Sequence, residues 1–411
     1  MAKTLRVGIV GANAERGWAR ESHVPAVQKL AGLEFAAVAS KGQDTADAAA
    51  RAFGVGKAYG DAADMFRDPD IDLVTVAVTL PAHHALVLGA LEAGKHIYCE
   101  YPLGLDVAES EVLAEAARKS GVRSAIGLQT RGSPAVRRAR ELTASGAIGR
   151  PLGVRVYSPA IGFGAVTNPA EAYTEKPENG VTVVTIQGAH TLDLVIALLG
   201  GFSDVSALAS TLHPEIRIGD GAPQKRTTFD HLLVQGRLAS GAAASVEVAG
   251  GRPAGTPFRL DITGESGVLT LEGGAMRGFQ AGRLRFLLNG EPQAVDEGES
   301  AGMPDFFNAV GRLPTAKLRR SDACTTCAAN RKRPHTRSRA RMFAVHGARP
   351  YCPISAPMPS HAEAQNADSM DRRRCWRIRC RSVLCFGLPG KRSRSAPGRA
   401  VTLPTESQPS R

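Results

Sequence analysis

The first 130 residues alternate short apolar runs with helical patterns, and this alternation leaves few folds open to the chain. The apolar runs predict buried strands at residues 5–10, 35–39, 72–78, 96–99 and 124–128. The helical patterns between them end near residue 30 or cover residues 45–53, 83–93 and 107–119. Strands and helices that alternate at this spacing form right-handed βαβ units. The sequence therefore predicts an α/β domain with a doubly wound parallel sheet over residues 1–125.

The pattern changes after about residue 130. Helical patterns remain at residues 133–145 and 189–199. The other apolar runs predict strands at residues 152–157, 205–212, 231–238, 243–249, 258–263, 268–271 and 284–288. Alternation of apolar and polar residues along such runs is typical of antiparallel sheets with one buried face. We therefore predict an α+β domain with a large, mainly antiparallel sheet over residues 126–316.

The net charge of +12 is concentrated at one end of the chain. Residues 1–316 carry 30 Lys and Arg against 34 Asp and Glu, whereas residues 317–411 carry 21 against 5 and hold six of the seven cysteines. This tail has three interpretations: a disordered basic arm that binds nucleic acid or acidic partners, a zinc module at Cys324 and Cys327, or out-of-frame translation from near residue 313. We predict a basic, low-order tail, and we expect a nucleic-acid partner only if the tail is genuine.

Composition also bears on the compartment. No stretch approaches the roughly 18 to 20 consecutive apolar residues that span a bilayer, and the N-terminus lacks an apolar signal segment. Cys99 is the single cysteine of residues 1–316, so no disulfide framework can form there. We expect a cytoplasmic protein without a membrane partner.

The turn after the first predicted strand carries a dinucleotide-binding signal. A regular G-x-G-x-x-G motif that includes Gly11 would place its second glycine at position 13. Asn13 stands there instead, and asparagine is one of the few other residues that tolerate a left-handed conformation. The alternative is a tight strand-to-helix turn that binds no ligand.

The end of the second predicted strand bears on the choice of cofactor. An acidic residue at this place would bond the ribose hydroxyls of NAD. Ser40 and Lys41 stand there, and a hydroxyl with an ammonium group can hold a 2′-phosphate. The sequence therefore leaves NAD and NADP open and slightly favours NADP. The alternative is that Lys41 is a solvated loop residue.

Five segments carry a family resemblance, namely residues 79–84, 90–103 (ALEAGKHIYCEYPL), 129–131, 146–151 and 188–193 (GAHTLD). Over about residues 4–310 the chain resembles the Gfo/Idh/MocA oxidoreductases. Residues 17–26, 128–134 and 179–181 are most similar to the branch that contains the galactose-regulon repressor of yeasts. That repressor works as a nucleotide-binding regulator.

The resemblance implies a Rossmann domain that binds NAD or NADP and a second domain that holds a carbohydrate or polyol and forms homo-oligomers. It implies hydride transfer between nicotinamide and a hydroxyl or carbonyl carbon. The alternative is a non-catalytic NAD(P)-binding transcriptional regulator. The residues expected on the cofactor side are Gly11, Asn13, Trp18, Ser40, Lys41, Thr79, His84, Glu100, Pro102 and Arg131, with His23 as a further neighbour of the nicotinamide.

Three of these expectations carry further detail. The resemblance implies a cis peptide bond before Pro102, against a base rate of about 5–6% for X-Pro bonds. It places Thr79 and His84 where a strand exit meets the cofactor. For Arg131 a surface salt bridge is the alternative to a cofactor or substrate contact.

The chain departs from the family pattern where the chemistry takes place. Tyr101 replaces the lysine of Glu-Lys-Pro, and Ile186 replaces the first aspartate of D-x-G-x-H-x-x-D. His190 remains as a candidate acid or base that titrates near neutrality, with Asp193 beside it as a substrate residue. Tyr101 can act as an acid only if a neighbouring cation lowers its pKa from about 10. Otherwise it packs beside the cofactor.

Overall fold

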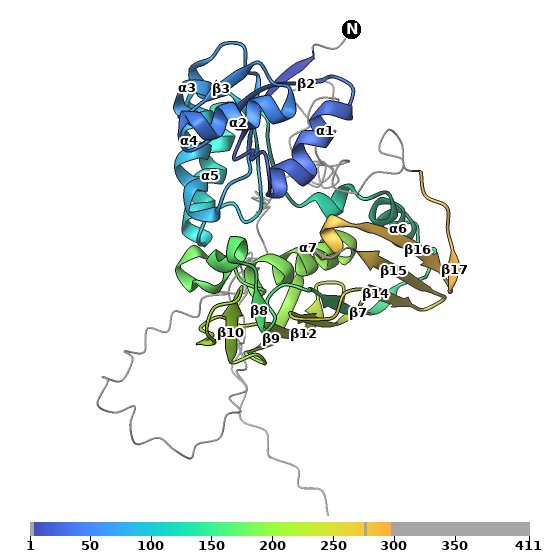
Figure 1. Cartoon of the computed structure of the whole chain (residues 1–411). Coiled ribbons are helices and arrows are strands. Elements are labelled where there is room, and N and C mark those ends of the chain that lie inside the picture. Colours follow the sequence, from blue (N-terminus) through green and yellow to red (C-terminus); the bar gives the residue numbers. More distant parts are fainter. Residues whose placement is uncertain (1–3, 275–277, 297–411) are drawn as a thin grey trace, which may run out of the picture. The chain divides into compact units, whose positions relative to one another are not determined.

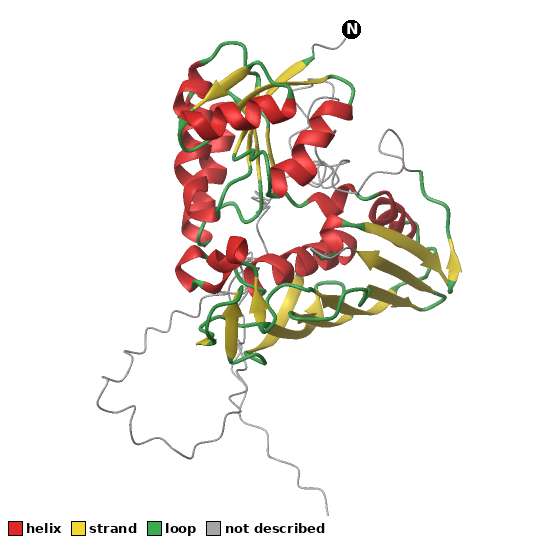
Figure 2. Ribbon diagram, viewed as in Figure 1, coloured by secondary structure: helices red, strands yellow, loops and turns green. Residues whose placement is uncertain are grey.

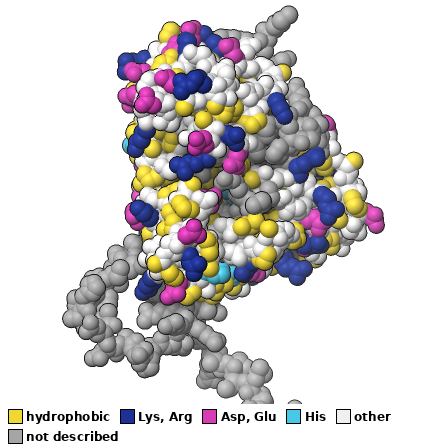
Figure 3. Space-filling model, in the orientation of Figure 1, with side chains coloured by type: hydrophobic (Ala, Val, Ile, Leu, Met, Phe, Trp, Pro, Cys, Tyr) yellow, Lys and Arg dark blue, Asp and Glu magenta, His cyan; other side chains and the backbone are white. Residues whose placement is uncertain are grey.

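The computed structural model describes residues 4–274 and 278–296 (Figure 1). The predicted basic tail at residues 317–411, with its candidate zinc pair, lies outside the described residues. On the face shown in Figure 3, basic and acidic side chains of the described residues are interspersed.

A six-stranded parallel sheet forms the N-terminal part, in the order β3-β2-β1-β4-β5-β6. Its strands are β1 (Leu5–Val10), β2 (Leu33–Ala39), β3 (Lys57–Tyr59), β4 (Leu73–Val76), β5 (His96–Cys99) and β6 (Ser124–Ile126). The predicted doubly wound sheet is confirmed. The strand order reverses between β1 and β4, and ligands of such sheets bind at the carboxyl ends of the strands beside this reversal.

Helices cover both faces of this sheet (Figure 2). They are η1 (Ala19–His23), α1 (Val24–Lys29), α2 (Gln43–Phe53), α3 (Ala62–Arg67), α4 (His83–Glu92) and α5 (Val107–Ser120). Two short turns, η2 (Leu80–Ala82) and η3 (Gln129–Gly132), follow β4 and β6. Buried side chains of α1 and α2 pack with Val7 and Ile9, whereas those of α3, α4 and α5 pack with Val10 and Val76. Alternate residues of each strand therefore enter different cores.

Local signals explain several helix ends. The Asp106 side chain accepts a hydrogen bond from the Glu109 amide at 2.8 Å, which caps the start of α5. Gly121 ends the same helix in the left-handed conformation, with φ of 69°. Neither β3 nor α3 was predicted from the sequence. The reason for β3 is that a strand of three half-buried residues shows no apolar run.

An eight-stranded sheet forms the second part, in the order β17-β16-β15-β14-β7-β13-β12-β9. Its strands are β7 (Pro151–Pro159), β9 (Phe202–Ser210), β12 (His231–Leu238), β13 (Ala243–Ala249), β14 (Phe258–Gly264), β15 (Val268–Gly274), β16 (Arg283–Leu288) and β17 (Glu291–Pro292). The β7 and β13 strands pair in parallel and the other neighbours are antiparallel, so the mainly antiparallel sheet is confirmed.

A small sheet that the sequence did not predict has the order β11-β10-β8. Its strands are β8 (Val166–Thr167), β10 (Glu215–Ile218) and β11 (Gln224–Lys225), and runs of this length carry no periodicity. Three short helical segments lie between β7 and residue 189, namely η4 (Pro169–Glu175), η5 (Pro177–Asn179) and η6 (Val184–Gly188). A fourth, η7 (Phe279–Ala281), lies between β15 and β16.

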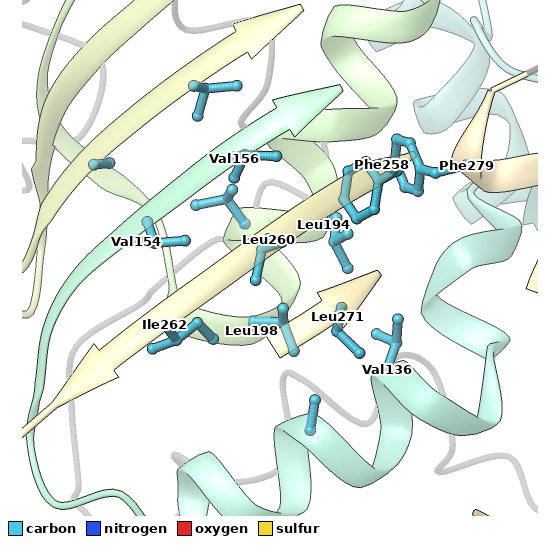
Figure 4. Packing of buried hydrophobic residues seen from close by; sticks show 14 of the residues in the cluster. Val136, Val154, Val156, Leu194, Leu198, Phe258, Leu260, Ile262, Leu271 and Phe279 are labelled. Carbon is cyan, nitrogen blue, oxygen red and sulfur yellow. The ribbon is translucent and has the colours of Figure 1, made fainter. Parts of the chain in front are cut away.

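Two helices, α6 (Pro134–Ala144) and α7 (Ala189–Leu199), pack on the inner face of the large sheet (Figure 4). Leu194 and Leu198 of α7 are buried among strand side chains such as Leu260 and Ile262. The Phe258 and Phe279 rings stack with centroids 4.2 Å apart. This packing fixes α7, which carries the predicted catalytic histidine.

One helical segment among the described residues, Pro177–Leu199, is long and apolar enough by composition to cross a membrane. It includes α7, and 61% of its apolar window is buried inside the protein. Burial against the large sheet accounts for its apolar character as a core helix.

Candidate functional site

The predicted cofactor residues all follow parallel strands at the carboxyl edge of the first sheet. Each loop contributes some of them: Gly11, Asn13 and Trp18 after β1, Ser40 and Lys41 after β2, Thr79 and His84 after β4, Glu100 and Pro102 after β5, and Arg131 after β6. Thr79 is exposed, whereas His84 and Trp18 are half-buried. Trp18 packs against the core beneath α1.

In the turn after β1, Asn13 does not adopt the left-handed conformation that the sequence suggested for it. Among the described residues, the left-handed non-glycine positions are Phe163 and Asn289, so Asn13 does not use that conformation. Gly11 and Gly17 do, with φ of 92° and 99°. The Asn13 side chain instead accepts hydrogen bonds from the amides of residues 15 and 16, at 2.9 and 3.1 Å. The side chain thus closes the turn itself, which removes the need for a left-handed residue at position 13.

The loop after β2 carries Ser40 and an exposed lysine, Lys41. The Ser40 hydroxyl donates a hydrogen bond to the Ala12 carbonyl at 3.4 Å, which links the loops after β1 and β2. Lys41 is exposed and forms no ion pair with any described residue. This ammonium group is available to a phosphate.

Glu100 is held from two sides. His23 Nε2 lies 2.6 Å from Glu100 Oε1, and the His23 ring meets the Tyr98 ring edge-on at 5.1 Å. His23 is 1% exposed, and its Nδ1 atom is buried without a partner among the described residues. A side chain at Gly127 would clash with the Glu100 carboxylate, so glycine leaves the room that this carboxylate fills.

The Tyr101–Pro102 peptide bond is cis, as the resemblance implied. His83 Nδ1 lies 2.8 Å from the Pro102 carbonyl oxygen, and Nε2 lies 3.1 Å from the Val78 carbonyl oxygen. His83 therefore ties the loop after β5 to the loop after β4. His83 was not among the predicted site residues, because only the phase of α4 shows that it is the buried member of the pair His83 and His84. The predicted role of His84 stays a prediction.

Tyr101 and His190 meet edge to face, with ring centroids 5.2 Å apart and an interplanar angle of 62°. Burial raises the pKa of Tyr101, and the charge of Asp193 raises it further. The condition for an ionised Tyr101, a cation that lowers its pKa, is thus not met. Burial lowers the pKa of His190, while the charges of Asp193 and Glu100 act in the opposite direction. A neutral imidazole can accept a proton.

Asp193 is bound by Arg131. Arg131 Nε donates to Asp193 Oδ2 at 2.8 Å, and a terminal guanidinium nitrogen donates to the other carboxylate oxygen. Asp193 is 3% exposed. The salt bridge considered for Arg131 therefore exists, but it lies at the candidate site. Ile186 lies in η6, before His190, and offers no polar group.

Two further groups of polar residues were missed. Gln129 and Thr130 of η3 are 3% and 4% exposed, and Gln129 Oε1 and Thr130 Oγ1 are buried without partners among the described residues. The Ser158 hydroxyl accepts hydrogen bonds from Gln187 Nε2 at 2.9 Å and from Thr191 Oγ1 at 2.8 Å. These bonds hold the end of η6 and the start of α7 on β7, on both sides of His190. No pattern in the sequence distinguishes such residues from other polar ones.

Two pockets lie away from these residues. One of about 370 Å³ is lined by residues that include Arg252, Phe258 and Phe279. The other, of about 330 Å³, is lined by Leu105, Asp106, Glu178 and Gly180. Neither pocket contains a predicted catalytic residue.

Two family profiles match the chain. Residues 5–128 match "Oxidoreductase family, NAD-binding Rossmann fold", and residues 134–273 match "Gal80p, C-terminal domain".

Relatives include both enzymes and a regulator. The chain is 32% identical over 289 residues to the dehydrogenase aclE of Aspergillus oryzae, covering 66% of this chain and 78% of that protein. It is 29% identical over 334 residues to the galactose/lactose metabolism regulatory protein GAL80 of Saccharomyces cerevisiae, covering 73% and 76%.

Solved structures give the same two groups. A super-repressor mutant of Gal80p from Saccharomyces cerevisiae superimposes with a TM-score of 0.69 at 26% identity, covering 76% of this chain and 86% of that chain. Levoglucosan dehydrogenase in complex with NADH and L-sorbose superimposes with a TM-score of 0.64 at 24% identity, covering 76% and 90%. The second likeness concerns the fold alone.

Proposed function

Because the chain belongs to the Gfo/Idh/MocA oxidoreductase family, near its Gal80 branch, we propose that it transfers a hydride between a nicotinamide cofactor and a sugar- or polyol-type hydroxyl or carbonyl carbon. The observation that carries this proposal is the buried His190, which lies beside Tyr101 and has a pKa lowered by burial. The similarity to a levoglucosan dehydrogenase of Pseudarthrobacter phenanthrenivorans and to a 1,5-anhydro-D-fructose reductase of Ensifer adhaerens supports a carbohydrate-type substrate.

The residues at the carboxyl edge of the first sheet fit a dinucleotide. Gly11 leaves no side chain in the turn after β1, and Lys41 presents an exposed ammonium group after β2. The unpartnered Nδ1 of His23, beside Glu100, is a buried polar atom of the kind that bound ligands satisfy. A bound nicotinamide supplies the hydride acceptor or donor. In this proposal Glu100 and Pro102 lie on the nicotinamide side, and Ser40 and Lys41 lie on the side of the adenosine ribose.

His190 is assigned the proton. In alcohol oxidation the carbon loses a hydride, its oxygen loses a proton to the neutral imidazole, and the C–O bond becomes a carbonyl. In reduction the imidazolium returns that proton. Tyr101 keeps its own proton because its pKa is raised, so we assign its hydroxyl the role of a neutral hydrogen-bond donor to the same oxygen. Asp193 stabilises the imidazolium that forms.

Ser40 and Lys41 support a preference for NADP. Neither residue repels a 2′-phosphate, and the exposed Lys41 ammonium attracts one. The preference is measured by titrating NADP and NAD against the full chain and following protein fluorescence. Equal or weaker affinity for NADP would reject it.

The second candidate is a non-catalytic NAD(P)-binding regulator. Tyr101 in place of the family lysine, together with the similarity to GAL80, favours it. A screen of sugar and polyol oxidation with either cofactor separates the two functions, with His190→Ala as the control. Binding without turnover identifies a regulator, turnover that survives His190→Ala removes His190 from the mechanism, and absence of cofactor binding rejects both functions.

A further inference from the structure

Arg131 connects the candidate catalytic helix to the carboxyl edge of the first sheet. His190 and Asp193 lie three residues apart on α7, and side chains at this spacing share one face of a helix. Arg131, from η3 after β6, holds both oxygens of the Asp193 carboxylate. The Asp193 side chain is 4% exposed and that of Arg131 is 35% exposed, so the buried member of the pair is the anion.

A buried carboxylate needs a cation or a proton. Two groups can meet the need of Asp193: the Arg131 guanidinium and a protonated His190, whose pKa responds to the Asp193 charge. The two cations therefore compete for one anion. While Arg131 occupies Asp193, the pull of Asp193 on a proton at His190 is weakened.

We propose that Arg131 is a positioning residue that engages Asp193 through both carboxylate oxygens, weakens the attraction of Asp193 for a proton on His190, and so acts together with burial to favour the neutral imidazole that accepts the substrate proton. Among the described residues, Glu100 and Tyr101 also face His190, both from the loop after β5. His23 pairs with Glu100, and Tyr101 is uncharged. Loss of Arg131 removes the cation that Asp193 binds through both carboxylate oxygens. The consequence for catalysis rests on the proposed function, whereas the protonation of His190 is independent of it.

Arg131→Gln keeps a hydrogen-bonding side chain and removes the charge. We expect the titration midpoint of His190 to rise by about one pH unit or more, because the Asp193 charge then acts on His190 alone. Arg131→Lys restores a charge and is expected to return most of the shift. Asp193→Asn removes the anion beside a remaining cation, and it is expected to lower the midpoint.

The measurement is an NMR pH titration of the full chain with isotope-labelled histidine, in which the signal absent from His190→Gln identifies His190. Arg150→Gln is the matched control, since Arg150 and Glu265 form an exposed pair at 2.8 Å with side chains 61% and 50% exposed. This control is expected to leave the midpoint unchanged. A His190 midpoint in Arg131→Gln that equals the wild-type value overturns the inference. If Arg131→Gln does not fold, an unchanged midpoint in Asp193→Asn overturns it instead.

Kinetics give a second readout. In Arg131→Gln the acidic limb of the pH profile for oxidation should move to higher pH by the same interval as the NMR midpoint, and Arg131→Lys should reverse most of that movement. A lower rate with an unmoved pH profile would assign the pair a structural role only and would contradict the inference. Absence of turnover in the wild type would defeat the proposed function, while the NMR titration would still decide the inference.

Discussion

Arg226→Ala removes the cation of a buried network that lies between the small sheet and the start of β12 in the large sheet. The Arg226 side chain is 0% exposed. It bonds Glu175 at 2.9 Å and Asp230 at 3.0 Å, and it donates to the carbonyls of Phe163 at 2.9 Å and Gly164 at 2.8 Å. The side chains of Glu175 and Asp230 are 5% and 1% exposed. The substitution therefore leaves two buried carboxylates without a cation.

The magnitude follows from what remains after the change. Loss of one partner from a buried ion pair costs about 3–5 kcal/mol. Glu175 would keep hydrogen bonds from the Thr167 and Thr228 hydroxyls, and Asp230 would keep those from the amides of residues 212 and 213. These bonds hold the cost to that of one broken pair rather than two. We expect a loss of about 3–5 kcal/mol from a stability that is typically about 5–15 kcal/mol.

Urea unfolding of the full chain, followed by circular dichroism, measures this loss. Arg150→Ala is the control, because it breaks an exposed pair with Glu265 that contributes only about 0–1 kcal/mol. Arg226→Ala should shift the unfolding midpoint far more than the control does. A shift no larger than that of Arg150→Ala would refute the reasoning, since it would mean that the buried carboxylates find other partners at little cost.

Three further predictions concern the site. Gly127→Ala should weaken cofactor binding about tenfold in a titration, because its methyl group displaces the Glu100 carboxylate. Gly56→Ala is the control, since Gly56 has open space around it and its substitution should leave the affinity unchanged. Equal affinities of the two variants would contradict the displacement of Glu100. Burial lowers the pKa of His190 in the folded protein, so on acidification this histidine takes up its proton in the unfolded chain at a higher pH than in the folded one. The free energy of unfolding should therefore fall as the pH drops below about 6.5, the ordinary pKa of histidine. His190→Gln should reduce that fall in unfolding scans between pH 7 and 5, and an unchanged acid dependence would exclude the contribution. Lys41→Glu should weaken NADP binding more than NAD binding, and an equal effect on both would place Lys41 away from the 2′-phosphate.

Much of the fold could be predicted because its signals are local. The runs that became β1, β5 and α7 match the observed bounds residue for residue, since each is a mainly apolar segment that ends close to turn residues. The small sheet could not be predicted in this way. Its strands are short, and it is held by Arg226, which binds Glu175 and Phe163 from 51 and 63 residues away in the sequence.

The candidate site was predictable as an edge of a sheet but not as a set of contacts. Parallel strands place their carboxyl ends together, so the loops could be assigned from their order alone. Whether His83 or His84 is buried depends on the phase of α4. The pairing of Arg131 with Asp193 depends on the packing of segments that lie 62 residues apart in the sequence. A sequence without its fold carries neither kind of information.

Charge balance links the departures from the family pattern to the contacts that the chain makes. The candidate site contains two carboxylates, Glu100 and Asp193, and the family lysine would add a cation between the loop after β5 and α7. Here that position is a buried, uncharged Tyr101, and each carboxylate has a separate partner from another loop: His23 after β1 and Arg131 after β6. A lysine at position 101 would be a cation beside the buried His190, where like charge opposes protonation of the imidazole. Tyr101→Lys alone should therefore lower the His190 midpoint rather than restore the family arrangement, because the partners of both carboxylates are already in place.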